Sequence, residues 1–405
     1  MRKYIFIICD GLGDLPIPEL GNKTPLEAAQ TSNLDRLASC GETGLMYVLG
    51  KGVRPNSDDA HWVLFGYNPN DCPKRGPIEA AGVGIKLQEG DIAIRANLAT
   101  VDEDLKVIDR RAGRIENNSD FIRDLDGTEI EGVKFILKPG TGYRAALVMR
   151  GEGLSDKISN SDVHYVTEDN IVKHWEGLSV NVIKPLDDSP QTKFTAEILQ
   201  KFLEIAHQKL DQNPLNKKRE EQGQLKANYL LTRGPGYFKK LATFREKYNL
   251  SSCCIAGAGL YKGLGVLMGM DLIDVPGATG MLDTNVEAKI QAAKEEISKY
   301  DFVFVHIKPT DIFGENGDFL GKKDFIEKID RAIDSLEDTG ATICVTADHA
   351  TPCATKDHSA DPVPVLIFKP GGTNGQAVKF GENESAKGSL GIIEGKDLLK
   401  ILLHS

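Results

Sequence analysis

Ala341-Thr-Ile-Cys-Val-Thr346 is an unbroken run of apolar and β-branched residues, and Ala347-Asp348-His349 follows it directly. Such a run predicts a buried strand of a parallel sheet. In open α/β sheets, ligands bind at the carboxyl ends of the strands, which is where Asp348 and His349 are expected to lie. Aspartate and histidine together suit a divalent metal such as Zn or Mn. This stretch therefore predicts an α/β fold with a metal at one edge of its sheet.

Strand and helix patterns alternate at both ends of the chain. Tyr4–Cys9 and Phe302–Ile307 are further apolar runs that predict strands, and Pro25–Ser39 has apolar residues at helical spacing before Gly41. Strands that alternate with helices form parallel βαβ units. We therefore predict an α/β fold with a doubly wound, mostly parallel sheet.

The middle of the chain has a different pattern. From about 93 to 187, short strand-like runs such as Val133–Leu137 and Ala145–Met149 are separated by turn residues, and long helical patterns are few. We expect an α+β domain inserted into the α/β domain, with the helical pattern of Thr195–Leu210 leading back into the latter. The predicted domains are 1–92 with 188–405, and 93–187.

Composition limits the class of protein. The 405 residues carry a formal net charge of −10, which argues against a nucleic-acid-binding protein because such proteins usually have a basic balance. No apolar run is long enough to span a membrane. Met1–Cys9 is basic and then apolar like a signal peptide, but Asp10 ends the run early and no cleavage site follows, so a first strand is the better interpretation. With seven scattered cysteines, we expect reduced thiols and a cytoplasmic location.

Aspartates recur at the ends of predicted strands. Asp10 ends the first strand, and Asp311 follows the strand that ends at Ile307. One aspartate in a loop carries little information. Three aspartates at one edge of a sheet, together with His349 and His358, are typical of a metal site.

Three other segments contain residue types that can carry chemistry. Ser57, in Pro55-Asn-Ser-Asp-Asp-Ala-His61, is a candidate nucleophile because a metal lowers the pKa of a bound hydroxyl, although an ordinary turn is the alternative. Arg110-Arg111-Ala-Gly-Arg114 is a cationic patch suited to phosphate or carboxylate, with a solvated turn as the alternative. Other arginines of the same segment could add to this patch, namely Arg95, Arg144 and Arg150. Gly257-Ala-Gly259-Leu-Tyr-Lys262 lacks the last glycine of a dinucleotide fingerprint, so we do not predict NAD binding there. His306, on a buried strand, is expected to be a core histidine.

Taken in order along the chain, these segments resemble the cofactor-independent phosphoglycerate mutases of the short archaeal-type branch, within the alkaline phosphatase superfamily. The segments that carry the resemblance are Asp10-Gly11, Asn56–His61, Arg110–Arg114, Lys308-Pro-Thr-Asp311, Asp348-His349 and His358-Ser-Ala-Asp-Pro-Val-Pro364. The resemblance implies a sheet of alkaline phosphatase type with an inserted, substrate-binding lid domain. It also implies interconversion of 3-phosphoglycerate and 2-phosphoglycerate in glycolysis and gluconeogenesis, without 2,3-bisphosphoglycerate.

The resemblance also implies roles for individual residues. Ser57 would be the nucleophile that becomes phosphoserine, and Lys308 would contact the phosphate near two divalent ions drawn from Mn, Mg, Zn and Co. The first ion would be held by Asp10, Ser57, Asp348 and His349, and the second by Asp311, Glu315 and His358. The lid residues that grip the substrate would be Arg95, Arg110, Arg111 and Arg114.

One position departs from the family pattern. The family has histidine four residues after the second-ion aspartate, whereas Asp311-Ile-Phe-Gly-Glu315 has glutamate. A carboxylate can still bind a divalent ion, and replacing imidazole with an anion favours the harder ions Mn or Mg. A loose or absent second ion, with reduced activity, is the alternative.

Two other functions stay open at this stage. A metal-dependent phosphatase or phosphotransferase of the same superfamily would share every metal ligand and would differ in a lid that admits water. A non-catalytic metal-binding descendant would have begun to lose its site at Glu315, although the remaining ligands are intact. We expect phosphoglycerates as the substrates and no nucleic-acid or membrane partner, and a homo-oligomer is left open.

Overall fold

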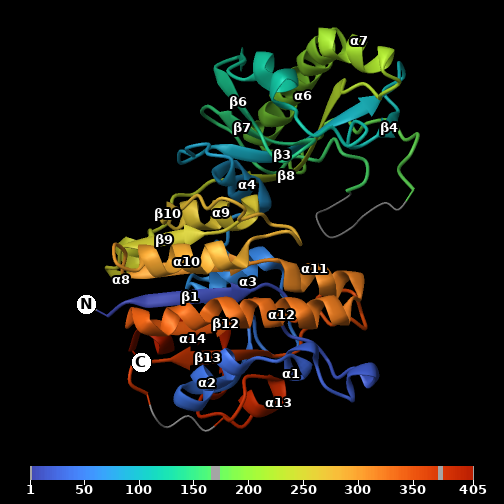
Figure 1. Ribbon diagram of the computed structural model, residues 1–405. Coiled ribbons are helices and arrows are strands. Elements are labelled where there is room, and N and C mark those ends of the chain that lie inside the picture. Colours follow the sequence, from blue (N-terminus) through green and yellow to red (C-terminus); the bar gives the residue numbers. More distant parts are fainter. Residues whose placement is uncertain (1, 166–173, 373–376, 405) are drawn as a thin grey trace. The chain divides into compact units, whose positions relative to one another are not determined.

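The computed structural model describes residues 2–165, 174–372 and 377–404, which form two compact units (Figure 1). The first unit comprises Met1–Cys72 and Ala242–Ser405, and the second comprises Pro73–Leu241. The second unit is an insertion, as expected, but it begins earlier and ends later than the predicted segment 93–187. The reason is that β3 (Ile92–Val101) pairs with β8 (Tyr229–Tyr237), which lies beyond the predicted end of the insert.

The first unit is built on an eight-stranded, mostly parallel sheet in the order β10-β9-β11-β1-β12-β13-β2-β14. Central β1 pairs in parallel with β11 on one side and β12 on the other, whereas β13 is antiparallel to both of its neighbours. The strands are β1 (Tyr4–Cys9), β2 (Glu42–Tyr47), β9 (Ser252–Ile255), β10 (Asp271–Leu272), β11 (Phe302–Ile307), β12 (Thr342–Thr346), β13 (Val363–Phe368) and β14 (Gly391–Glu394). This sheet confirms the predicted fold class.

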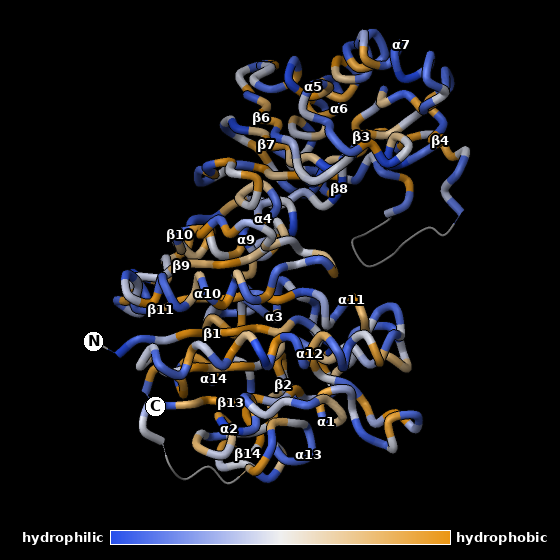
Figure 2. Tube along the Cα trace, viewed as in Figure 1, coloured by the Kyte–Doolittle hydropathy of each residue, from blue (hydrophilic) through white to orange (hydrophobic). Residues whose placement is uncertain are grey.

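Helices of the first unit fall into two groups that pack among themselves. One group contains α2, α10 and α12, and the other contains α3, α9 and α14. The helices of this unit are α1 (Pro25–Ala28), α2 (Ser32–Cys40), α3 (Ser57–Leu64), α8 (Phe244–Tyr248), α9 (Gly259–Leu267), α10 (Val286–Glu296), α11 (Pro309–Asn316), α12 (Phe319–Ile333), α13 (Glu382–Ser385) and α14 (Gly395–His404). Every residue of β1 is buried, and the strand is hydrophobic along its length in Figure 2. A strand covered on both faces has to be apolar throughout, which explains the unbroken runs in the sequence.

The single helix predicted over Pro25–Ser39 is in fact two helices. Ala29 has an extended backbone and ends α1. The carboxylate of Asp330, on α12, accepts hydrogen bonds from the backbone N–H groups of Asn33 and Leu34 and so caps the start of α2.

The second unit has a six-stranded sheet in the order β4-β3-β7-β6-β5, with β8 also paired to β3. Its pairs are antiparallel, which together with its helices makes an α+β fold. Its other elements are α4 (Arg75–Gly82), β4 (Val107–Asp109), α5 (Ser119–Ile122), β5 (Glu129–Ile130), β6 (Val133–Pro139), β7 (Arg144–Arg150), α6 (Pro190–Asp211) and α7 (Pro214–Glu221). The prediction that Thr195–Leu210 returns to the α/β domain was wrong, because α6 packs in the core of the second unit, where Phe202 stacks on Phe135 with ring centroids 4.0 Å apart. Among the described residues, no helix is both long and apolar enough to cross a membrane.

Candidate metal centre

Three neighbouring strands of the first unit bring aspartates to one edge of the sheet. Asp10 directly follows β1, Asp348 lies just after β12, and Asp311 is in the first turn of α11, which follows β11. The carboxyl ends of these strands meet because β1 is parallel to both of its neighbours. All three aspartates are fully buried. The three aspartates therefore lie together at the edge of the sheet where the sequence predicts them.

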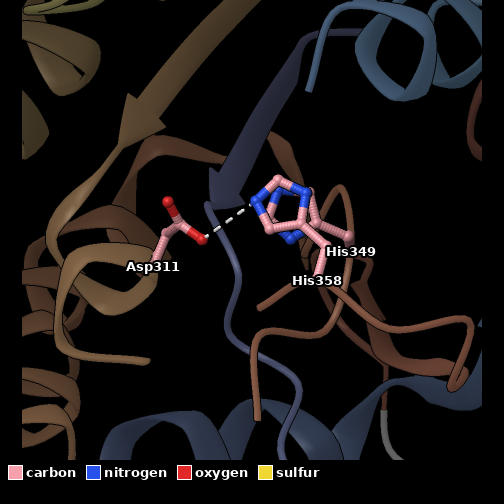
Figure 3. Close-up of side chains that lie close together, drawn as sticks. All are labelled: Asp311, His349 and His358. Carbon is pink, nitrogen blue, oxygen red and sulfur yellow. Dashed lines mark ion pairs between the residues drawn. The ribbon is translucent and has the colours of Figure 1, made fainter. Parts of the chain in front are cut away.

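Among the described residues, two groups of side chains that could hold a metal have ligand atoms within 4.8 Å of one another. The first group is Asp10, Asp348 and His349, and the second is Asp311, His349 and His358. Figure 3 shows the second group, in which the two imidazole rings stack with centroids 3.6 Å apart and His358 Nε2 lies 3.5 Å from Asp311 Oδ1. Since His349 belongs to both groups, the five residues form one continuous cluster of donors.

The cluster fits a divalent metal. Asp10 Oδ1 and Asp348 Oδ2 are buried, and within the described part of the chain neither accepts a hydrogen bond. A buried carboxylate oxygen without a partner is costly, and a cation between the two oxygens removes that cost. Both oxygens also lie near His349 Nε2, at 3.4 and 3.3 Å. Carboxylate and imidazole donors are those that Mn and Zn accept.

Charges within the cluster shift its pKa values. Burial opposes ionisation of Asp10, but Lys308 Nζ lies 3.1 Å from its Oδ2 and holds the pKa of Asp10 well below its usual value. Burial and then the charge of Asp10 raise the pKa of Asp348. Burial also opposes protonation of His349, but the carboxylates around it, Asp348 first, raise the pKa of His349 to about 9. A metal that binds His349 therefore displaces a proton near neutral pH.

Ser57 lies beside this cluster at the start of a helix. It is the first residue of α3, it is 5% exposed, and its Oγ is 3.5 Å from His349 Nε2. The helix begins here because Asn56 and Asp59 form a capping box, in which the Asn56 N–H donates to Asp59 Oδ1 at 2.8 Å. A helix N-terminus favours negative charge, so this position suits an alkoxide or a phosphate.

Glu315 lies outside both groups of ligand atoms. It is near the end of α11, one helical turn after Asp311, and it is exposed to solvent. Partial burial and the negative charge of Asp311 raise the pKa of the Glu315 carboxyl. Glu315 is thus electrostatically coupled to the cluster without being part of it.

Three buried aromatic residues next to the cluster were not assigned to the site from the sequence. His61 Nδ1 donates to the carbonyl of Ser57 at 2.7 Å, His306 Nε2 lies 3.0 Å from Asp10 Oδ2, and the hydroxyl of Tyr261 donates to the same oxygen. Burial lowers the pKa of His61 to about 3 and that of His306 to about 4, so both rings are neutral at pH 7. His306 is a core residue, as expected, but it also supports the site. The one available signal was that His61 follows Ser57 by one helical turn.

The predicted substrate-binding arginines lie in the second unit and differ in their surroundings. Arg110 is buried, and its guanidinium makes two hydrogen bonds to the carboxylate of Asp162, at 2.8 and 2.5 Å. Arg111 and Arg114 are exposed. Arg110 therefore holds the segment around Asp162 in place, and its charge is already neutralised by that carboxylate.

Arg95 faces a second arginine that the sequence patterns did not single out. Arg95 on β3 is directly opposite Arg233 on β8, and Arg95 Nε lies 2.8 Å from Glu79 Oε1. Arg233 Nε is buried and has no hydrogen-bond partner among the described residues, and its guanidinium lies 4.2 Å from the ring centroid of Tyr165. Like charges directly across a sheet repel each other, so an anion between them would be stabilising.

Comparison with known proteins identifies the relatives of this chain. The metalloenzyme superfamily matches residues 2–405. The 2,3-bisphosphoglycerate-independent phosphoglycerate mutase of Methanosphaera stadtmanae is 44% identical over 99% of this chain and 97% of its own length. A protein of the same name, numbered 1, from Archaeoglobus fulgidus is 46% identical over 98% of this chain and 97% of its own. Among solved structures, the cofactor-independent phosphoglycerate mutase from Thermoplasma acidophilum is 38% identical, covers 100% of this chain and 99% of its own, and superposes with a TM-score of 0.76.

Proposed function

Because this chain belongs to the 2,3-bisphosphoglycerate-independent phosphoglycerate mutases of the metalloenzyme superfamily, and so interconverts 3-phosphoglycerate and 2-phosphoglycerate, we propose that Ser57 carries the phosphoryl group during the reaction. The enzyme is an isomerase of glycolysis and gluconeogenesis that depends on divalent metal and does not need 2,3-bisphosphoglycerate. The observation that supports Ser57 as the carrier is its place at the start of α3, with Oγ 3.5 Å from His349 Nε2.

Two ions are proposed at the cluster, and the proposed division of ligands is the one that the family resemblance implies. The first ion would be held by Asp10, Ser57, Asp348 and His349, and the second by Asp311, Glu315 and His358. Glu315 is included because it follows Asp311 by one turn on α11 and is electrostatically coupled to Asp311 and His358. When bound, such ions polarise phosphoryl oxygens and lower the pKa of a coordinated hydroxyl. A carboxylate at position 315 favours Mn or Mg.

Residues of the first unit are proposed to supply the nucleophile and a positive charge for the phosphoryl transfer. Ser57 Oγ attacks phosphorus in line, so that the Oγ–P bond forms while the bond between phosphorus and the glycerate oxygen breaks, and the departing oxygen gains a proton in exchange for the one that the Ser57 hydroxyl loses. The Lys308 ammonium, which lies 3.1 Å from Asp10 Oδ2 and 2.5 Å from Asp311 Oδ2, adds positive charge where the phosphoryl oxygens would lie. The glycerate turns and attacks phosphoserine through its other hydroxyl, which regenerates free Ser57.

The second unit would act as the lid that holds the glycerate. Arg95, Arg111 and Arg114 are proposed to bind its carboxylate and phosphate, and Arg233 joins them because its Nε lacks a hydrogen-bond partner among the described residues. Arg110 is proposed to contribute to substrate binding only indirectly, because its guanidinium is paired with Asp162. We also propose a cytoplasmic location without nucleic-acid or membrane partners, in keeping with an acidic chain whose seven cysteines are expected to be reduced thiols. A homo-oligomer of this chain is a further proposal.

The phosphoserine step is tested with metal-loaded enzyme, 3-phosphoglycerate and no 2,3-bisphosphoglycerate, following both 2-phosphoglycerate and free phosphate. Acid quenching and mass spectrometry of tryptic peptides should find a phosphate on Ser57. Ser57→Ala should abolish formation of 2-phosphoglycerate while circular dichroism stays unchanged, and Ser39→Ala, at an exposed serine of the same unit, should remain active. Retained activity of Ser57→Ala would refute the mechanism, and release of phosphate without 2-phosphoglycerate would favour the phosphatase alternative.

A further inference from the structure

The segment Gly257–Lys262 has no role in the function proposed above, although its glycines made it conspicuous in the sequence. Its first two residues lie between β9 and α9, and the remaining four, Tyr261 among them, form the first turn of α9. The Tyr261 side chain is buried, with 2% of the residue exposed, and its hydroxyl donates a hydrogen bond to Asp10 Oδ2. The segment therefore reaches the candidate metal centre through Tyr261.

The two oxygens of the Asp10 carboxylate have different surroundings. Oδ2 accepts from Tyr261 and also lies 3.0 Å from His306 Nε2 and 3.1 Å from Lys308 Nζ. Oδ1 accepts no hydrogen bond from the described residues, and it lies 3.4 Å from Nε2 of His349, a member of the same group of possible metal ligands. One oxygen is thus saturated with donors, and the other is left for a metal.

We propose that Tyr261 is a positioning residue, whose hydroxyl fixes the Asp10 carboxylate so that Oδ1 faces the metal. This inference rests on the proposed role of Asp10 as a metal ligand. Ligating carboxylates are commonly held by hydrogen bonds from residues that do not touch the metal, and these bonds set the orientation of the ligand.

The Tyr261 ring is itself held on several sides. It stacks on the ring of His306 with centroids 3.3 Å apart and planes 19° apart, and the His61 ring lies 4.9 Å away. Lys308 Nζ lies 6.0 Å from its centroid. With the ring fixed by these contacts, the hydroxyl has one direction, which is toward Asp10.

Backbone packing sets the position of α9 and hence of Tyr261. A Cβ at Gly257 would overlap the carbonyl of Thr279, so glycine is needed for this close approach. Lys289 is fully buried, and its Nζ donates to the carbonyls of Thr279 and His306, at 3.3 and 3.0 Å. One lysine thereby fixes both the loop against which Gly257 packs and the strand that carries His306. Tyr261 and His306, the two neutral donors to Asp10 Oδ2, are thus both held in place through Lys289.

The test is the dissociation constant of Mn²⁺ for the full-length protein after removal of bound metal, measured by isothermal titration calorimetry. Tyr261→Phe keeps the ring and removes only the hydroxyl, so Mn²⁺ should bind about 10- to 100-fold more weakly. Tyr67→Phe is the matched control, because Tyr67 is 7% exposed and its hydroxyl donates to the carbonyl of Ala242 at 3.0 Å, a hydrogen bond that involves no proposed ligand. The control should change Mn²⁺ affinity by no more than about twofold.

A purely structural role for Tyr261 would lower thermal stability as in the control and leave Mn²⁺ affinity intact, and that result would overturn the proposal. Tyr261→Met also lacks the hydroxyl, and its flexible side chain adapts to an altered pocket, so the outcome does not depend on the folding of one variant. Asp10→Asn separates the two levels of inference. If Asp10→Asn loses Mn²⁺ binding and both Tyr261 variants keep it, only the inference about Tyr261 fails. If Asp10→Asn also keeps it, the proposed metal ligand is wrong.

Discussion

Lys308→Met tests whether the buried carboxylates of the metal centre depend on a single lysine. Lys308 Nζ lies 3.1 Å from Asp10 Oδ2 and 2.5 Å from Asp311 Oδ2, and both aspartates are fully buried. Removing one partner of a buried ion pair costs about 3–5 kcal/mol, because the remaining charge is left uncompensated. The Lys308 side chain is 20% exposed, and solvent screening places the expected loss at the lower end, about 3 kcal/mol.

The dependence of this loss on pH has a definite sign. Burial opposes protonation of Lys308, but the aspartates raise the pKa of the Lys308 ammonium well above its ordinary value of 10.5, so its contribution is fully present below that pH. The pKa of Asp10 is lowered, so its contribution is present above the ordinary value of 3.8 and is lost as the pH falls below it. The full effect of Lys308→Met is therefore expected at pH 7.

The assay is urea unfolding at pH 7 in the presence of a chelator, followed by tryptophan fluorescence. Trp62, which is fully buried in α3, reports on the first unit if the other tryptophan is removed by Trp175→Phe in every variant. Lys323→Met is the control, because Lys323 is 22% exposed and pairs with surface carboxylates, so its loss should cost less than about 1 kcal/mol. A loss for Lys308→Met no larger than that of the control would refute the electrostatic account of the site.

Two further outcomes concern metal binding. Glu315→His replaces an anion by imidazole. Competition titrations should show the ratio of the Mn²⁺ and Zn²⁺ dissociation constants changing by about tenfold in favour of Zn²⁺. An unchanged ratio would show that position 315 does not bind the metal. Mn²⁺ affinity should rise by about tenfold per pH unit as the pH approaches 9, because the metal must displace a proton from His349, whose pKa is raised to about 9 by the carboxylates around it. A flat profile in calorimetry between pH 7 and that value would contradict the assignment of His349 as a ligand.

Local sequence patterns were sufficient to predict the strands in the sheet of the first unit. They were insufficient to predict the residues at which the second unit begins and ends. β1, β11 and β12 are short apolar runs because both faces of each strand are covered, and such runs can be recognised without knowledge of the rest of the chain. The pairing of Ile92 with Tyr237 leaves no comparable local signal, since each partner is compatible with many neighbours. The break between α1 and α2 likewise depends on Asp330, which lies about 300 positions further along the chain.

The same distinction applies to the site. Asp10, Asp311 and Asp348 could be placed together because the ends of adjacent parallel strands must meet. Tyr261 and His306 could not be assigned to the site from the sequence. The direction of a buried aromatic side chain depends on the surrounding packing, and a buried histidine is more often a core residue than part of a site. The charge pattern also failed to separate Arg110, which is paired with Asp162, from the exposed arginines beside it.

The two units contribute different parts of the proposed reaction. The cluster at the strand ends would neutralise a phosphate and activate Ser57, and this chemistry would serve a phosphatase as well as a mutase, since the attack on phosphoserine is the same for water and for a glycerate hydroxyl. The products differ only in which nucleophile reaches phosphorus first. A bound glycerate has a very high effective concentration provided that it is held in the right orientation. When that orientation is lost, water attacks phosphoserine in its place. On this proposal, the metal ligands of the first unit would determine that phosphoryl transfer occurs, and the arginines of the second unit, Arg95, Arg111, Arg114 and Arg233, would determine that it ends in isomerisation.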